Sequence, residues 1–303
     1  MGLVLGVDGG NSKTDVVVAT TDGEPLSYVR GGGSNSHGPG GSAACIDVVA
    51  SLVELERTAD RAVLFLCGAD TPEDVSELGE LARARGWARE LIVDNDTFAL
   101  LHAGTDRADA VAVVCGAGIN CVGRRADGRV ARYPALGWET GDWGGGETLA
   151  RDALFLANRA ADGRGAKTTL VDLFESHFRK SVLEIGLDVH YRRMPSTRLG
   201  ELAAAIVELD DDVARELVRR LADEIVLLVE RTFRDLELDD ADVVLGGGML
   251  AERGRLFGLV ANRLPGTPTV PDVPPVAGAV LAALDGEARP RFRESFRGWM
   301  PGA

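Results

Sequence analysis

Residues 3–23 read LVLGVDGGNSKTDVVVATTDG and predict two strands joined by a glycine turn. The run from Leu3 to Val7 is short, apolar and bounded by glycine, as is typical of a buried strand. Residues 14–20 carry three consecutive valines and predict the second strand, because β-branched residues favour extended backbone. Asp22-Gly23 then predicts a hairpin turn, since this dipeptide suits the left-handed backbone of such turns.

The same pattern of strand, glycine turn and hairpin turn recurs further along the chain. Residues 111–115 (VAVVC) predict a strand, residues 116–120 (GAGIN) a glycine turn, and Asp127-Gly128 a second hairpin turn. The recurrence of one supersecondary pattern indicates a duplicated unit. We therefore predict a second copy that starts near residue 108.

Strands and helices alternate around these two turns. Apolar runs at residues 62–66 and 91–93 predict strands separated by helical segments, which is typical of an α/β fold. We expect an N-terminal α/β domain at residues 1–107 and a C-terminal α/β domain at residues 108–288. The sequence leaves the tail at residues 289–303 open between a docked helix and a loose end.

Three helices can be expected from their start signals and periodicity. Thr71-Pro72 opens one, because Thr is a good N-cap residue and Pro suits the first helical position. Residues 167–185 and residues 211–236 follow the helical period, and the latter segment places its apolar side chains on roughly one face.

Composition and charge exclude several classes of function. The 303 residues include 33 Lys and Arg against 47 Asp and Glu, for a net charge of −14. Surfaces that bind nucleic acid or anionic membranes are basic, so neither partner is expected. A nucleotide stays compatible with this charge, because backbone N–H groups and a metal ion can hold a small phosphate.

The sequence also points to a cytoplasmic protein. Its uncharged stretch at residues 110–122 contains glycines and is shorter than the roughly 18 residues that a membrane span needs. The cysteines have no CxxC spacing, which is consistent with buried, reduced thiols in the cytosol. The scattered histidines make a zinc site improbable.

Three glycine turns each follow an apolar strand directly: Gly9-Gly10, Gly116-Gly118 and Gly246-Gly248. Glycine lets the backbone approach a ligand and expose successive N–H groups to an anion, although a tight hairpin explains any one turn as well. The stretch GGNSKT is not a P-loop, because Asn11 stands where that motif has its second glycine. No GxGxxG follows a strand either.

Together these motifs resemble the acetate and sugar kinase/Hsp70/actin superfamily. The opening stretch is similar to its first phosphate loop, VVCGAGINCVG to its second, and VVLGGGML to its adenosine loop. Gly33-Ser34-Asn35, Asn95-Asp96 and Gly137-Trp138 with Gly141-Asp142 resemble the N-acetylglucosamine kinase branch of the BadF/BadG/BcrA/BcrD ATPase family. The resemblance implies two ribonuclease H-like (actin-like ATPase) domains with an interdomain cleft. It also implies an ATP-dependent kinase for the 6-hydroxyl of N-acetylglucosamine or a related amino sugar.

The resemblance further implies how ATP and Mg²⁺ are held. Asp8 would hold Mg²⁺ through water, with a structural salt bridge as its alternative role. Lys13 would add a cation at the phosphates, and a solvated turn lysine is the alternative. The residues assigned to ATP are Gly9, Gly10, Asn11, Ser12, Lys13, Gly116, Ala117, Gly118, Gly246, Gly247 and Gly248.

Asp96 would act as the base that takes the proton from the sugar hydroxyl. Asp94 competes for this role, because side chains two residues apart on a strand point to one face, and only the resemblance prefers Asp96. Capping of the following helix is an alternative for either residue. For Trp138, filling of the core is the alternative to a sugar contact. The residues assigned to the sugar are Asn35, Asp96, Asn120, Gly137, Trp138 and Asp142.

Departures from the family pattern leave alternatives open. Ala117 and Ile119 stand where the family has hydroxyl side chains, so sugar identity is undecided. One alternative is an activator ATPase of the 2-hydroxyacyl-CoA dehydratase/benzoyl-CoA reductase type, which holds a [4Fe–4S] cluster at a dimer interface. Cys115 and Cys121 flank a phosphate loop, which is a poor place for such ligands. Another alternative is a non-catalytic sugar or nucleotide sensor. The oligomeric state, a homodimer included, is not determined by the sequence.

Overall fold

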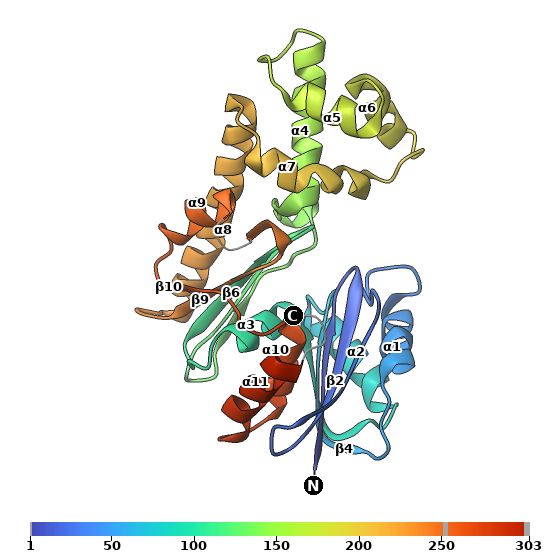
Figure 1. Cartoon of the computed structure of the whole chain (residues 1–303), viewed down its shortest axis with the longest axis vertical. Coiled ribbons are helices and arrows are strands. Elements are labelled where there is room, and N and C mark those ends of the chain that lie inside the picture. The colour runs from blue at the N-terminus through green and yellow to red at the C-terminus, as the bar shows by residue number, and fades with distance from the viewer. Residues whose placement is uncertain (1, 251–253, 300–303) are drawn as a thin grey trace. The chain divides into compact units, whose positions relative to one another are not determined.

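The structure is a computed structural model that describes residues 2–250 and 254–299 (Figure 1). The strands are β1 Leu3–Gly9, β2 Lys13–Thr20, β3 Pro25–Gly32, β4 Ala59–Leu66, β5 Ala88–Asn95, β6 Ala110–Cys115, β7 Ile119–Arg124, β8 Val130–Arg132, β9 Asp242–Gly246 and β10 Thr267–Thr269. The α-helices are α1 Gly41–Leu52, α2 Pro72–Arg83, α3 Thr97–Gly104, α4 Gly145–Ala161, α5 Leu170–Phe178, α6 Val182–His190, α7 Ala203–Glu208, α8 Asp212–Leu236, α9 Arg255–Ala261, α10 Pro275–Ala283 and α11 Ala288–Trp299. Short 3₁₀ helices are η1 Trp138–Thr140, η2 Ser196–Leu202 and η3 Gly248–Leu250.

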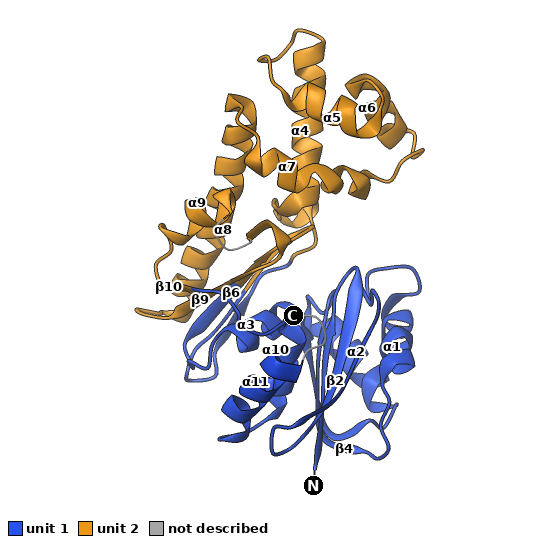
Figure 2. Ribbon diagram, in the orientation of Figure 1, with its two compact units in different colours: residues 1–112, 122–134, 269–303 blue, residues 113–121, 135–268 orange. Residues whose placement is uncertain are grey.

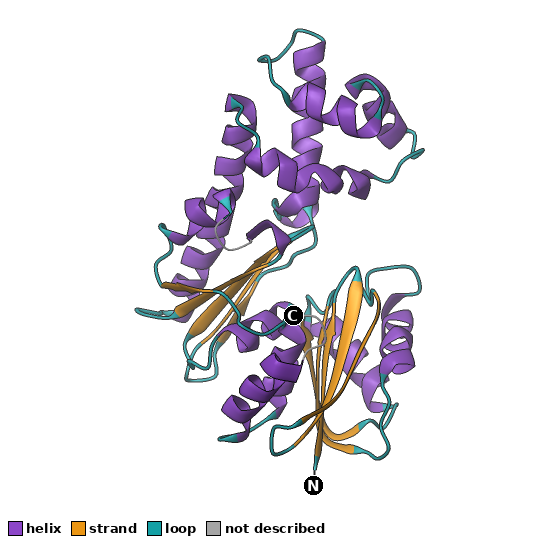
Figure 3. Cartoon of the chain, in the orientation of Figure 1, coloured by secondary structure: helices purple, strands orange, loops and turns teal. Residues whose placement is uncertain are grey.

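The strands form two sheets (Figure 3), and equivalent strands follow the same spatial order in both. The first sheet has the order β3-β2-β1-β4-β5, and the second has the order β8-β7-β6-β9-β10. In the first sheet, β1 is antiparallel to β2 and parallel to β4. The predicted α/β fold with a duplicated unit is therefore confirmed, and β6 with β7 repeats the arrangement of β1 with β2.

The chain divides into two compact units (Figure 2). Unit 1 comprises residues 1–112, 122–134 and 269–303, and unit 2 comprises residues 113–121 and 135–268. The division passes through β6 and β7, and it returns the C-terminal segment to unit 1. From the repeated strand pattern, the sequence predicts a domain boundary near residue 108. This boundary stays a prediction.

The sheet of unit 1 has helices on both faces (Figure 1). Leu3, Leu5 and Val7 alternate along β1 and pack into one buried cluster with side chains of α1 and α2. On the other face α10 crosses β1. A Cβ at Gly6 would lie 2.6 Å from a methyl carbon of Val280, so this close approach requires glycine.

The tail that the sequence left undecided is helix α11 of unit 1. Phe292 and Phe296 are fully buried, and their rings stack with centroids 5.0 Å apart. Gly23 of the first hairpin turn has φ +91°, and its α-carbon lies against the backbone carbonyl of Ala288. Apolar burial therefore fixes this helix although the same segment carries four arginines.

Local capping decides where the predicted helices begin and end. Helix α2 begins as predicted, because Thr71 caps it and Pro72 opens it. The prediction of one helix over residues 167–185 is wrong. Arg179 ends α5 in the left-handed region with φ 57°, and Ser181 begins α6 with a capping box. None of the described helices is long and apolar enough to cross a membrane.

Candidate functional site

A row of carboxylates crosses the sheet of unit 1 where β1 and β5 end. Asp8 pairs with Asp15 on β2 and with Phe65 on β4, and Phe65 pairs with Asp94 on β5. Residues paired in this way lie on the same face of a sheet. The register therefore brings Asp8, Asp15 and Asp94 to one face, near the carboxyl ends of the parallel strands.

Asp15 is the neutralised member of the row. Its carboxylate accepts hydrogen bonds from Arg30 (2.6 Å from Nε) and from the Tyr28 hydroxyl (2.9 Å). Burial opposes the charge of Asp15, but these hydrogen bonds outweigh it and hold its pKa below the usual value. Lys13 Nζ lies 3.3 Å from the same carboxylate, so Lys13 is neither free in solvent nor unpaired.

Asp8 is the member of the row whose charge is not compensated. It is half-buried, and none of the described residues donates a hydrogen bond or forms an ion pair to its carboxylate. Burial and the charges of Asp96 and Asp15 together raise its pKa to about 7, although the charges of Lys13 and Arg30 act in the opposite direction. The alternative that Asp8 serves a structural salt bridge is therefore not supported.

The predicted first phosphate loop and the predicted sugar residue Asn35 lie together. Gly10 N–H donates to the Lys13 carbonyl (2.8 Å), and the Gly10 carbonyl accepts from Ser34 N–H (3.0 Å). The Asn35 amide nitrogen lies 3.2 Å from Asn11 Oδ1. Backbone and side-chain contacts thus hold the turn at residues 9–13 against the segment that carries Asn35.

Asp94 and Asp96 differ in position and in partner. Asp94 lies on β5, but Asp96 lies beyond it with helical backbone (φ −61°, ψ −23°), so the expectation that both share a strand face is wrong. Arg132 forms a two-point ion pair with Asp94 (2.9 and 3.0 Å). None of the described cations forms such a pair with Asp96. Burial and the charge of Asp70 together raise its pKa to about 7, against a lowering by backbone hydrogen bonds from Thr97 and from Asp96 itself.

Asp70 is a residue of this cluster that sequence reasoning missed. It follows β4 and accepts a hydrogen bond from the Asn95 amide nitrogen (2.8 Å). His37 lies between two acids, with Nδ1 3.8 Å from Asp70 and Nε2 3.6 Å from Asp74. The signal in the sequence was an acid a few residues after the apolar strand β4, which is parallel to the strand before Asp96.

In unit 2, the predicted second phosphate loop is held by the start of α4. Gly146 N–H donates to the Gly116 carbonyl (2.7 Å), and Glu147 N–H donates to the Ala117 carbonyl (3.0 Å). Gly145 has φ +78°, and a Cβ there would overlap the backbone of Gly118. The backbone at residues 116–118 is therefore bound from one side, while Ala117 and Gly118 are exposed on the other.

The predicted adenosine loop meets the same end of β6. Gly247 has φ +89°, and a Cβ there would overlap the Cys115 carbonyl. Gly247 and Gly248 are themselves exposed, and Gly246 is half-buried. Within unit 2, the loops at residues 116–118 and 246–248 therefore lie at neighbouring strand ends.

The predicted sugar residues of unit 2 form a compact turn. Gly137 N–H donates to Asp142 Oδ2 (3.3 Å), and burial raises the pKa of Asp142. Trp138 is 74% exposed, so the alternative that it fills the core is wrong. Asn120 lies on β7, where its side-chain oxygen accepts from Cys121 N–H (2.8 Å).

Comparisons with known proteins agree with this geometry. The model of the BadF/BadG/BcrA/BcrD ATPase family matches residues 5–284. The chain belongs to this ATPase family. The family resemblance that its sequence motifs suggest is thereby confirmed, and the match covers both sheets and all three glycine loops.

Individual relatives of this family member are similar over most of their length. The N-acetylmuramic acid/N-acetylglucosamine kinase of Clostridium acetobutylicum is 27% identical over 274 residues, which cover 85% of this chain and 88% of that protein. The N-acetyl-D-glucosamine kinase of Dictyostelium discoideum is 24% identical over 294 residues (86% and 90%). A crystal structure of a candidate N-acetylglucosamine kinase from Chromobacterium violaceum has a TM-score of 0.74 at 22% identity, covering 93% of this chain and 98% of that one. This last likeness shows the fold.

The two cysteines that flank the second phosphate loop do not fit an iron–sulfur cluster shared between subunits. Cys115 and Cys121 are both completely buried, and burial raises the pKa of each thiol to about 12. Cluster ligands are thiolates, and at a shared interface they must reach the surface. The Sγ atom of Cys121 instead lies 3.3 Å from the Thr232 hydroxyl. The activator ATPase alternative is therefore not supported.

The donor set around Asp8 does fit Mg²⁺. A magnesium ion keeps several waters and takes only one or two protein carboxylates, alongside phosphate oxygens. Asp8 offers one hard oxygen ligand whose charge no described cation neutralises directly. The described residues hold no cluster of three or more His, Cys, Asp or Glu that would enclose a metal. The site therefore suits a hydrated, phosphate-bound Mg²⁺ and not an all-protein cage.

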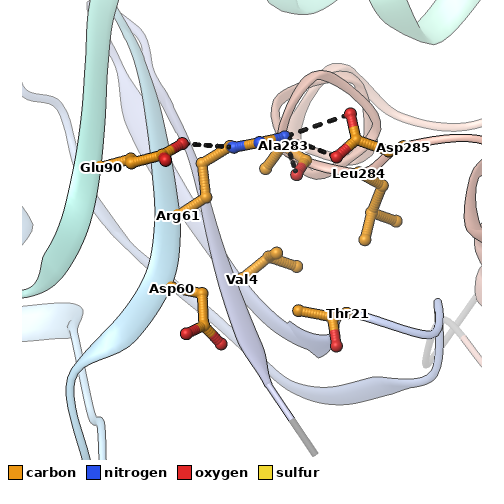
Figure 4. A pocket seen from close by; sticks show the side chains of 8 residues that line it. All are labelled: Val4, Thr21, Asp60, Arg61, Glu90, Ala283, Leu284 and Asp285. Atoms are coloured by element: carbon orange, nitrogen blue, oxygen red, sulfur yellow. Dashed lines mark hydrogen bonds and ion pairs between the residues drawn. The ribbon is translucent and has the colours of Figure 1, made fainter.

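A separate cavity in unit 1 carries no ligand chemistry of this kind (Figure 4). It has a volume of about 180 Å³ and lies at the other end of β1, near Val4. Arg61 spans it and binds Glu90 (3.1 Å), Asp285 (3.2 Å) and the Ala283 carbonyl (3.0 Å). These contacts tie the end of α10 to β4 and β5.

Proposed function

We propose that this protein transfers the γ-phosphoryl group of ATP to the 6-hydroxyl of N-acetylglucosamine or a related amino sugar. The observation that carries the proposal is the contrast between two neighbouring carboxylates. Arg132 pairs with Asp94, whereas Asp96 is half-buried, pairs with no cation in the described part of the chain and has a pKa of about 7. A carboxylate with a pKa near the working pH is suited to accept the proton of an attacking hydroxyl.

Phosphoryl transfer requires positioning of the reactants and neutralisation of charge more than covalent bonds to the protein. Asp96 would accept the hydroxyl proton as the sugar oxygen bonds to the γ-phosphorus and the bond to the β-phosphate oxygen breaks. Asn35, in the same unit, would orient the sugar. Asn120, Gly137, Trp138 and Asp142 would supply further sugar contacts from β7 and the turn around η1.

The nucleotide would be held mainly by backbone groups. The N–H groups at residues 9–13 and 116–118 would bind the phosphates, and the loop at residues 246–248 would pack against adenosine. Mg²⁺, when bound, would neutralise charge on the transferring phosphoryl group, with Asp8 as its protein ligand through water. Lys13 would partly neutralise the charge of Asp15, with which it forms an ion pair.

The choice of an amino sugar is supported by the kinases to which the chain is similar. Both relatives named above are N-acetylglucosamine kinases, and one of them is also named for N-acetylmuramic acid. An exposed tryptophan suits the apolar face of a sugar ring, and Asn and Asp side chains suit its hydroxyls.

A coupled ADP-release screen over amino sugars, their N-acetyl forms and plain hexoses tests this function. We expect sugar-dependent ADP release with at least one N-acetylated amino sugar, and none with the corresponding 6-deoxy sugar, which lacks the acceptor oxygen. ³¹P NMR of the product should report a phosphate ester at carbon 6. Sugar binding without ADP release would instead favour the non-catalytic sensor.

A further inference from the structure

Asp15, on β2, is a buried carboxylate that side chains from two strands hold in place. It is 1% exposed. Arg30 donates to it twice, from Nε (2.6 Å) and from Nη2 (3.1 Å), and the Tyr28 hydroxyl donates once (2.9 Å). Lys13 Nζ lies 3.3 Å from the same carboxylate. Asp15 therefore connects Arg30 on β3 to Lys13, a residue of the predicted first phosphate loop.

The charges of this cluster do not cancel. Lys13 and Arg30 are two cations on the single carboxylate of Asp15. Both cations also remain open to solvent, with side chains that are 48% and 50% exposed. One cation is enough to neutralise one carboxylate, so the cluster carries an excess of positive charge in a chain whose net charge is −14. Such a local excess beside a predicted phosphate loop is suited to bind an anion.

Asp15 also fixes how the guanidinium of Arg30 is presented. The carboxylate occupies Nε and Nη2, which form one edge of this planar group. Among residues 2–250 and 254–299, no group accepts a hydrogen bond from Nη1. The hydrogen bond to Asp15 raises the pKa of Arg30, so the guanidinium stays charged. Asp15 thus orients a cation that still has N–H groups to donate.

The strand register places this cation on the face of the sheet that carries Asp8. Asp8 pairs with Asp15, and Asp15 pairs with Arg30, across three neighbouring strands. Residues paired in this way lie on one face of a sheet. Burial raises the pKa of Asp8, and the charges of Lys13 and Arg30 act against that rise, so both charges are felt at the proposed magnesium ligand. A phosphate bound to Mg²⁺ at Asp8 would therefore lie on the same face as Arg30.

We infer that Arg30 is a phosphate-binding residue: Asp15 orients its guanidinium, and the N–H groups that Asp15 does not use bind a terminal phosphate of ATP. The inference rests on the proposed function. It adds a side-chain contact to a nucleotide that backbone groups would otherwise hold. A guanidinium suits this role, because its planar set of N–H donors matches the oxygens of a phosphate.

Isothermal titration of Arg30→Gln with nucleotides tests this contact without any need for turnover. We expect ATP binding to weaken about 10- to 100-fold relative to the wild type, which is the range for a hydrogen bond to a charged group. Binding of AMP, which lacks the terminal phosphates, should weaken less than about threefold. Arg30→Lys keeps the charge but loses the planar donors, so it should fall between the two. Equal losses for ATP and AMP in Arg30→Gln would contradict the inference.

Two control variants separate the phosphate contact from other effects of the substitution. Tyr28→Phe removes a different donor to Asp15 and leaves the guanidinium in place, so it should change ATP affinity less than about threefold. Arg89→Gln removes one positive charge from an ion pair with Asp60 (3.1 Å), at the start of β4 and β5, and should leave ATP affinity unchanged. If either control weakened ATP binding as much as Arg30→Gln does, the inference would be wrong.

A double substitution distinguishes phosphate binding from mere support of Asp15. Asp15→Asn combined with Arg30→Gln removes one charge of each sign, so the net charge of the cluster is kept and no buried carboxylate loses its cation. We expect ATP affinity to stay about 10-fold or more below that of the wild type, because the phosphate contact is still missing. Recovery of wild-type ATP affinity in the double variant would overturn the inference.

The inference and the proposed function can fail separately. A wild type that binds ATP but transfers no phosphoryl group to any sugar would defeat the kinase proposal alone. A wild type with sugar-dependent turnover, whose Arg30→Gln variant binds ATP equally well, would defeat the Arg30 contact alone. A wild type that does not bind ATP would defeat both.

Discussion

Arg132 and Asp94 form a two-point ion pair at the end of β5, with Nη1–Oδ1 and Nη2–Oδ2 distances of 2.9 and 3.0 Å. The guanidinium of Arg132 also lies over the Phe98 ring, 5.4 Å from its centroid. This pair fixes the orientation of the Asp94 carboxylate. None of the described cations pairs in this way with Asp96, two residues later, which is the base that we propose.

Substitution of the two acids should therefore have unequal effects. Asp96→Asn should lower turnover by about 10²- to 10⁴-fold, because the base is lost, while ATP affinity stays nearly unchanged. Asp94→Asn should lower turnover far less, since its pair with Arg132 is partly exposed and contributes little to stability. Steady-state kinetics and isothermal titration with ATP check both. Equal losses would remove the base role from Asp96.

Activity should fall on the acid side of neutrality. The base must be deprotonated to work, and burial with the charge of Asp70 raises the pKa of Asp96 to about 7. A raised pKa moves the acid limb upward, so kcat/KM should decline as the pH falls through about 7. Asp8 and Asp96 interact, so the midpoint belongs to the pair. The check is a pH profile at constant ionic strength and constant free Mg²⁺; a flat profile between pH 5.5 and 8 would count against the proposal.

Asp8→Asn should abolish Mg²⁺-dependent turnover and yet stabilise the metal-free protein. Burial raises the pKa of Asp8 from 3.8 to about 7, so the folded state retains a proton that the unfolded chain releases. This contribution to the free energy of unfolding is complete below about pH 4 and is lost as the pH rises through 7. The gain in Tm should thus be larger at pH 8 than at pH 5.

Thermal melts in EDTA measure this gain. Asp22→Asn is the control, because Asp22 is exposed and Asn-Gly suits the same hairpin turn. It should leave Tm nearly unchanged at both pH values. If Asp8→Asn lowers Tm at pH 8, Asp8 has a structural partner and the assignment as a magnesium ligand loses its support.

Alanine substitutions of two neighbouring tryptophans should have different effects, one on sugar binding and the other on stability. Trp138 is 74% exposed, so Trp138→Ala should leave stability within about 0.5 kcal/mol and raise KM for the sugar about 3- to 10-fold. Trp143 is 6% exposed, donates from Nε1 to Asp152 (3.0 Å) and has the Arg220 guanidinium 3.7 Å above its ring. Trp143→Ala should therefore cost about 3–5 kcal/mol of stability.

Urea unfolding together with sugar kinetics distinguishes these two outcomes. A folded Trp138→Ala variant with an unchanged KM for every sugar substrate would exclude Trp138 from the sugar site. The Trp143→Ala variant serves as the reference for a structural tryptophan in the same turn.

Alanine substitutions at two glycines, one in the second phosphate loop and one that packs against it, should also have different effects. Gly145 has φ +78°, and a Cβ there would overlap the backbone of Gly118, so Gly145→Ala should destabilise the protein and disorder the loop. A Cβ at Gly118 meets no atom within 4 Å, so Gly118→Ala should melt like the wild type. If this loop binds the phosphates through its backbone, as we propose, the new methyl group in the open space beside it should nonetheless raise KM for ATP. An unchanged KM for ATP in Gly118→Ala would place the nucleotide elsewhere.

The sequence by itself determined the features that depend on neighbours within a few residues. Short apolar runs and Asp-Gly turns identified the repeated strand pairs of both sheets, and Thr71 with Pro72 identified the start of α2. Short-range turn chemistry and periodicity are readable in this way because each signal lies within one element. The break between α5 and α6 at Arg179 was not predicted, because the residue with left-handed backbone there is not a glycine.

Only the tertiary structure decided between chemically similar side chains. Asp94 and Asp96 look alike in the sequence, and the residue that separates them, Arg132, comes from β8. Trp138 and Trp143 are likewise separated only by what packs against them. Charge compensation and burial depend on groups contributed by distant parts of the chain, and the local sequence therefore carries no record of them.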